Sequence, residues 1–268
     1  AHAGRRVGGY GWAFGIHESL DQFGAIVGPL LVAALLTRRG AFHAAFATLA
    51  APAAINLILV LVARLVYPRP QDLDTSPPGV HGRGLPRVYW VYLAGAALVA
   101  AGFADYPIIA YHLSREGVAR GEWIAIFYSV AMAVSGTGSL ALGRLFDRWG
   151  FSVLIGLTVL SAAFAPLVFL GGFGAALAGA AIWGLGMGVH ESIIPAAVAP
   201  MVRPERRASA FGLFTAGYGV FWFLGSAATG VLYDHSVHGA VAFCVLAEIA
   251  AVPVFVWVGR HYRPPRPA

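Results

Sequence analysis

The sequence predicts an all-α protein, a polytopic bundle of helices that crosses a membrane several times. Of its 268 residues, 59% are hydrophobic and only 11% are charged, whereas soluble domains carry about 25% charged residues. The hydrophobic residues also gather in stretches of the length that crosses the apolar layer of a bilayer as a helix, about 20 residues. The lack of charge and the length of these stretches both favour an integral membrane protein.

Eight such stretches are expected to span the membrane. They cover residues 10–36, 41–66, 88–113, 122–146, 151–170, 173–202, 208–233 and 239–258. Residues 67–87 are polar and rich in proline and glycine, which is typical of a linker. We therefore expect a first unit of two spans (1–66), a cytoplasmic linker (67–87), a unit of six spans (88–262) and a cytoplasmic tail (263–268).

The distribution of arginine predicts the orientation of these spans. All 18 basic residues are arginines. If the linker lies in the cytoplasm, 14 arginines fall on that side, and the four on the other side are Arg38, Arg39, Arg115 and Arg120. Basic residues concentrate in the cytoplasmic loops of membrane proteins. The pattern predicts a multi-pass protein of a bacterial inner membrane, with both ends of this chain in the cytoplasm.

The first span contains three ionisable residues within five positions, namely His17, Glu18 and Asp21. Helical spacing divides this span into two stripes. One stripe holds His17, Asp21, Gly24 and Gly28, and the other holds Gly11, Gly15, Glu18 and Gln22. Because each ionisable group is expensive at mid-membrane, these residues are candidates for a substrate or proton pathway. Pairing with neighbouring polar groups, which would hold the bundle together, is the structural alternative.

Two more positions place ionisable residues inside expected spans. Asp105 precedes Pro107, which removes a helix hydrogen bond, and broken helices often form substrate sites in transporters. His190 and Glu191 lie near the middle of the Gly-rich span 173–202. A carboxyl group at that depth could load and release a proton during transport. A hydrogen bond between helices is the structural alternative.

Other polar and aromatic residues in the spans have a weaker claim to function. We expect His112 to mark the outer membrane interface, and Glu248 to form a structural pair. Tyr128, Tyr218, Phe221 and Trp222 could line an apolar substrate cavity or simply pack, and the sequence does not separate the two.

Several classes of function are disfavoured. The segment from His190 to Ile194 is not the zinc-protease motif, because Ile194 replaces the second histidine. The chain contains no P-loop and no glycine-rich dinucleotide fingerprint after a strand. We expect no enzyme activity and no catalytic, cofactor or metal site, and no nucleotide or nucleic-acid partner. The expected partners are a small-molecule substrate, protons and the lipid bilayer.

Two motifs carry a resemblance to a known family. The segment Gly143-Arg-Leu-Phe-Asp147-Arg148-Trp-Gly150 resembles the G-x-L-x-D-R-x-G loop of the major facilitator superfamily. Its glycines permit close approach and a turn between helix ends, and Asp147 can cap or pair near a helix terminus. The segment from Gly24 to Pro29, with Gly28, is similar to the G-x-x-x-G-P signature of that family's antiporters. That signature usually ends in two small residues, and here Val32 and Ala33 stand there.

This resemblance implies a twelve-helix parent, in which the eight spans are helices 5 to 12 and residues 67–87 are the central loop. The chain would then be a fragment without helices 1 to 4. A weak internal repeat agrees with two related halves: a shift of 197 positions aligns Arg6 with Arg203, and Gly28 with Gly225. In such a protein Gly24, Gly28, Pro29, Gly143, Asp147, Arg148 and Gly150 serve helix packing and gating.

The predicted function is secondary active transport of a small molecule by alternating access. Proton-coupled efflux of a drug or metabolite is the first expectation, and protonation of Glu191, with Asp21 or Glu18, would select the favoured state. A proton symporter or a uniporter for sugars or metabolites is the alternative of the same class. A membrane sensor or assembly subunit that transports nothing is the alternative of another class.

Overall fold

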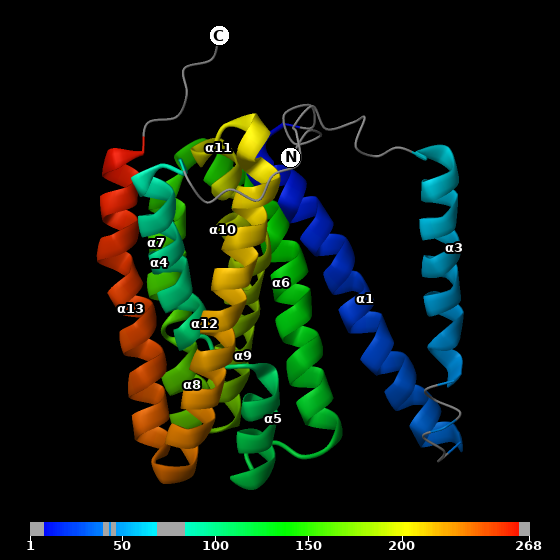
Figure 1. Cartoon of the computed structure of the whole chain (residues 1–268). Coiled ribbons are helices and arrows are strands. Elements are labelled where there is room, and N and C mark those ends of the chain that lie inside the picture. The colour runs from blue at the N-terminus through cyan, green and yellow to red at the C-terminus, as the bar shows by residue number, and fades with distance from the viewer. Residues whose placement is uncertain (1–7, 40–42, 44–46, 69–83, 263–268) are drawn as a thin grey trace.

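A computed structural model describes residues 8–39, 43, 47–68 and 84–262, and every regular element within them is a helix. The elements are α1 (Tyr10–Arg39), α3 (Ala50–Val66), α4 (Arg87–Gly102), α5 (Tyr106–Arg115), α6 (Glu122–Trp149), α7 (Phe151–Ser161), α8 (Phe164–Leu170), α9 (Phe173–Gly188), the π-helix η2 (Val189–Ile193), α10 (Ile194–Ala196), α11 (Val198–Met201), the 3₁₀-helix η3 (Pro204–Arg206), α12 (Arg207–His235) and α13 (Val237–His261). Figure 1 shows their arrangement.

Six helical stretches in the described residues are long and apolar enough to cross a membrane. They are Arg87–Arg115, Glu122–Trp149, Phe151–Leu170, Phe173–Met201, Arg207–His235 and Val237–His261. They correspond to the last six of the eight expected spans, so the predicted all-α membrane bundle is confirmed. The first expected span forms the single 30-residue helix α1. The second is described mainly from residue 47, where it forms the shorter apolar helix α3.

The six long stretches pack into one bundle. Helix α4 packs between α12 and α13. Helix α9 packs against α6 and α8, and α7 packs against α13. Two apolar cores follow one another along the bundle. Phe103, Phe127 and Phe164 belong to one core, and Tyr92 and Phe255 belong to the other. The second core lies toward the end where α6 ends and α7 begins, which we call the motif end and which is at the top in Figure 1.

Helix α1 joins the bundle through a close contact with α6, and α3 stands apart from it (Figure 1). A Cβ added at Gly143 would collide with the carbonyl oxygen of Gly11, and one at Gly15 would lie 2.5 Å from the carbonyl oxygen of Ser139. These small residues let two helix backbones touch, as is common inside membranes. No residue of α3 is buried.

Two of the long stretches are irregular in the middle of the bundle. The stretch from α4 to α5 unwinds at Phe103, Ala104 and Asp105. The break therefore lies just before Pro107, which occupies the first turn of α5, where a missing N–H is tolerated. The stretch from α9 to α11 contains η2, which includes His190 and Glu191. Such π-helical turns are often found at functional sites.

Candidate functional site

The two irregular segments meet inside the bundle. The ring centroids of Phe103, from the unwound segment, and His190, from η2, are 4.1 Å apart. The indole N–H of Trp183 on α9 donates a hydrogen bond of 2.8 Å to the carbonyl oxygen of Ala104. An unwound carbonyl inside a membrane protein needs such a partner, because no lipid group can supply one. The break is thus supported by the helix that carries η2.

Asp105 fixes the break to α12. The indole N–H of Trp222 donates a hydrogen bond of 2.5 Å to Oδ1 of Asp105, and the hydroxyl of Ser226 donates to Oδ2. Both donors lie on α12, and both carboxylate oxygens are occupied. Hydrogen bonds to an ionised acceptor are among the stronger ones in proteins. Asp105 therefore links the unwound segment to α12 by two side-chain bonds.

His190 is held by the same helix. Its Nδ1 lies 2.5 Å from the hydroxyl of Tyr218, while its buried Nε2 has no hydrogen-bond partner among the described residues. Tyr218, Trp222 and Ser226 recur at every fourth position of α12, and we call them the α12 polar stripe. Sequence reasoning missed this stripe as the partner of Asp105 and His190. The four-residue spacing of polar-tipped side chains was the signal that could have found it.

His112 also contacts α12, and its side chain is buried. It is 3% exposed, and its Nδ1 lies 2.8 Å from the hydroxyl of Tyr233. Asp105 and His112 therefore both face α12, in agreement with their seven-residue spacing. The ring is enclosed by Tyr233 and Phe169, so His112 packs inside the bundle, and its place at the level of the outer interface stays an expectation.

Glu191 points away from His190 and toward α1. It is exposed, whereas His190 is buried, as expected for neighbours about 100° apart on a helix. Across the contact between η2 and α1, Glu18 is 4% exposed and accepts a hydrogen bond from the side-chain amide of Gln22. The carboxyl groups of Glu18 and Glu191 interact electrostatically. We call these two residues the acid pair.

The other stripe of α1 is solvent- or lipid-facing in this structure. His17 and Asp21 form an ion pair of 3.1 Å on the surface, with their side chains 76% and 63% exposed. Gly24 and Gly28 have open space where a Cβ would lie. The side chain of Pro29 falls outside the described part of the chain. The structure thus brings Glu18, but neither His17 nor Asp21, into the packed contact with the bundle.

The loop motif serves the contact between α1 and α6. Asp147 accepts hydrogen bonds from the backbone N–H groups of Gly11 (2.9 Å) and Trp12 (2.8 Å). It thereby caps the start of α1, where free N–H groups favour a negative charge. Gly150 has a φ of 59°, which glycine adopts readily, and it makes the turn into α7. Arg148 is exposed beside the ring of Trp149.

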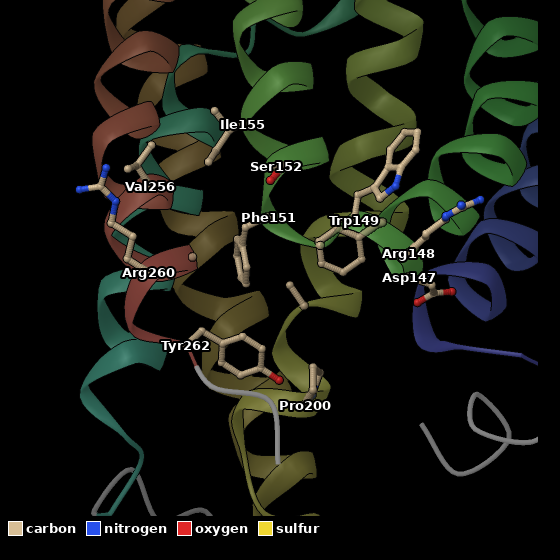
Figure 2. Close-up of a pocket in the computed structure, with 14 residues that line it drawn as sticks. Asp147, Arg148, Trp149, Phe151, Ser152, Ile155, Pro200, Val256, Arg260 and Tyr262 are labelled. Atoms are coloured by element: carbon tan, nitrogen blue, oxygen red, sulfur yellow. The ribbon is translucent and has the colours of Figure 1, made fainter. Parts of the chain in front are cut away.

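A cavity of about 640 Å³ opens beside this motif at the same end of the bundle. Figure 2 shows Asp147 and Arg148 at one side of it, next to α1, and Arg260 at the other, with Phe151 and Tyr262 between them. Neither the acid pair nor Asp105 lines this cavity. It is therefore separate from the candidate site formed by the break, η2 and the acid pair.

A bundle of membrane-length helices with a broken helix and inward-facing ionisable residues is found in many secondary transporters. The sequence matches the family described as Major Facilitator Superfamily over residues 9–195. The chain belongs to that superfamily, and the resemblance inferred from its motifs is confirmed.

Individual relatives come from mycobacteria. The chain is 33% identical over 253 residues to an uncharacterized protein of Mycobacterium bovis and to one of Mycobacterium tuberculosis, covering 92% of this chain and 62% of each relative. It is 28% identical over 252 residues to a chloramphenicol efflux pump of Mycobacterium tuberculosis, covering 88% of this chain and 59% of the pump. The chain thus spans about six-tenths of the length of these curated relatives. No solved structure matches it significantly.

Proposed function

We propose that this chain is part of a secondary transporter that exports a small molecule in exchange for protons by alternating access. The observation that carries this proposal is the acid pair. Glu18 comes from α1 and Glu191 from η2, so the pair joins the helix before the linker to the six-span bundle after it. A proton bound there would act on the contact between the two units.

The acid pair suits reversible proton binding for an electrostatic reason. Two nearby carboxylates repel each other, and one proton shared between them removes that repulsion. The negative charge of the exposed Asp21 acts on both carboxyl groups as well, and among the described residues the cation-forming group that acts on both is the exposed His17. No arginine of the described part acts on either carboxyl. Loading one proton would therefore favour a closed contact between α1 and η2, and losing it would favour an open one.

The substrate is proposed to bind beside the broken helix. Asp105 and His190 hold polar tips near the aromatic rings of Phe103, Trp183 and Trp222. Such a mixture of aromatic surface with a few polar groups suits an amphipathic compound. The relative that is a chloramphenicol efflux pump makes chloramphenicol the reasonable first probe.

The loop motif is proposed to latch one state. Asp147 caps α1 from the end of α6, and Gly11 and Gly143 hold the two backbones in contact. Separation of α1 from α6 at the motif end would break these contacts together. Gly24, Gly28 and Pro29 are proposed to pack against the remaining helices of the whole protein.

The proposed location is a bacterial inner membrane with the motif end in the cytoplasm. Figure 1 shows that α3, α6 and α13 finish and α4 begins at that end. The sequence places Arg64, Arg148, Arg260 and Arg87 at or near these helix ends. Arg115 and Arg120 lie at the opposite end, between α5 and α6. This bias follows the rule that positive residues stay on the cytoplasmic side.

Transport by the full-length native protein in proteoliposomes tests the proposal. We expect an imposed proton gradient to drive labelled chloramphenicol against its concentration gradient. Glu191→Gln should reduce this uphill transport at least about tenfold, because a neutral amide cannot release a proton. Glu116→Gln is the matched control, since Glu116 is exposed at the end of α5, and it should transport normally.

The same assay separates the alternatives. Substrate and protons moving in the same direction would identify a symporter, and downhill flux without proton movement would identify a uniporter. Uphill transport by Glu191→Gln with unchanged pH dependence would contradict the role of the acid pair. Absence of flux across a panel of drugs, sugars and metabolites, by a correctly folded protein, would favour a sensor or assembly subunit.

A further inference from the structure

Glu248 is a fully buried carboxyl group in the middle of α13. Neither of its carboxyl oxygens has a hydrogen-bond partner among the described residues. The sequence suggests a structural pair at this position, and the polar group that the structure brings to the carboxyl group from α7 is the neutral hydroxyl of Ser161. The hydroxyl of Ser161 on α7 faces the carboxyl group, yet it also makes no hydrogen bond of acceptable geometry.

The groups around Glu248 give it no counter-charge. On α4, a Cβ at Gly102 would lie 3.1 Å from Cγ of Glu248. The titratable groups that sense its charge are Tyr218 on α12 and Cys244 on α13 itself. Both are neutral acids under ordinary conditions, and neither supplies a positive charge. Within the described part of the chain, no arginine or histidine from the neighbouring helices acts on the charge of Glu248.

A buried carboxylate that has no cation beside it and no hydrogen bond of good geometry is strongly unfavourable, whereas the neutral acid is far less so. Buried ionisable groups inside membrane proteins usually face a partner or a pathway. We propose that Glu248 is a proton-binding site, separate from the acid pair, and that it carries its proton whenever α4, α7 and α13 pack as they do here.

The position of Glu248 links this proton to the broken helix. Gly102, which lies against the Cγ of Glu248, is the last residue of α4. The next residue is Phe103, whose ring contacts His190 on the other side of the break. An ionised Glu248 would need water or a cation, and the close contact of Gly102 with α13 leaves little room for either on that side. Bound proton therefore stabilises the packing of α4 on α13 behind the break.

Infrared difference spectroscopy on the full-length protein in lipid nanodiscs tests this proposal without any substrate. At neutral pH, the wild type minus Glu248→Gln spectrum should contain the carbonyl-stretch band of a protonated carboxyl group. Glu116→Gln, which changes an exposed carboxylate, should instead remove carboxylate bands. Loss of carboxylate bands in Glu248→Gln, with no protonated-carboxyl band, would overturn the proposal.

Two further variants, Glu248→Asp and Glu191→Gln, cover a folding failure of Glu248→Gln and a contribution from the acid pair. If Glu248→Gln does not fold, Glu248→Asp replaces it, because the shorter Asp side chain places the protonated carboxyl group in a different environment and shifts its carbonyl-stretch band. The same band position in the wild type and in Glu248→Asp would show that the band does not come from residue 248 and would contradict the proposal. Glu191→Gln should keep the Glu248 band, so the result does not depend on whether the acid pair couples transport.

Discussion

At the scale of single residues, the broken helix depends on side chains of α12. Asp105 receives one hydrogen bond from the Trp222 indole and another from the Ser226 hydroxyl. Tyr218, one turn earlier, bonds to His190. The α12 polar stripe therefore connects the break to η2 through adjacent turns of one helix. The break and η2 are thus joined by a continuous set of side-chain contacts.

Removal of the Trp222 indole N–H should weaken this link. Trp222→Phe should lower the free energy of unfolding by about 1–2 kcal/mol, because a hydrogen bond to a charged acceptor is lost between helices. In an Asp105→Ala background, Trp222→Phe should lower the free energy of unfolding by less, because the hydrogen bond is already absent. A double-mutant cycle on unfolding in mixed micelles measures the coupling. Strictly additive losses would show that the bond contributes nothing.

The two acids of α1 should behave differently. Glu18 is 4% exposed and meets η2, whereas Asp21 is on the surface in a pair with His17. Glu18→Gln should therefore reduce proton-driven transport by about tenfold or more, while Asp21→Asn should change it less than about twofold, since surface ion pairs contribute little. Initial rates of transport by the full-length protein check this. Equal losses in both variants would contradict the assignment of Glu18.

At the scale of elements, α1 is attached to the bundle by close backbone contact along α6. Gly11 and Gly15 on α1 leave no room for a Cβ against Gly143 and Ser139. Asp147 then caps the first turn of α1. Packing and capping act on the same pair of helices, so the loop motif and the small stripe of α1 form one structural unit.

A methyl group at this contact should separate the two helices. Gly143→Ala should destabilise the protein by about 1–3 kcal/mol, because the new Cβ meets a backbone carbonyl that cannot move freely. Gly156→Ala is the matched control on α7, where a Cβ meets nothing within 4 Å, and it should be neutral or stabilising by up to about 1 kcal/mol. Thermal unfolding measures both. A stable Gly143→Ala variant would rule out the tight contact.

At the scale of the whole molecule, the membrane-spanning helices were predictable, because they follow from the length and apolar composition of the stretches. The last six spans agree with the sequence because long apolar stretches leave few alternatives to a spanning helix. The local irregularities were harder. Pro107 indicated a break, but the unwound residues precede it, since proline is accommodated in the first turn of α5. The π-turn at His190 leaves no pattern in the apolar sequence.

The candidate site was predictable only in part. Asp105, His190 and Glu191 were found because ionisable residues are rare in apolar spans. Their partners were not, because Trp222 and Ser226 are common packing residues and their role depends on where α12 crosses the break. Helical spacing grouped Glu18 with Gly11 and Gly15, but it could not show which of the two stripes of α1 meets the bundle.

We propose that protonation of the acid pair, Glu18 and Glu191, is coupled to binding of the substrate beside the broken helix through the contact between α1 and η2. The most direct measurement is proton release when chloramphenicol binds to the purified full-length protein in weakly buffered detergent, followed with a pH indicator. We expect the wild type to release protons, Glu191→Gln to lose this release and Glu116→Gln to keep it. Saturable binding to the wild type without proton release, or equal release by Glu191→Gln, would show that the acid pair is not coupled to substrate binding.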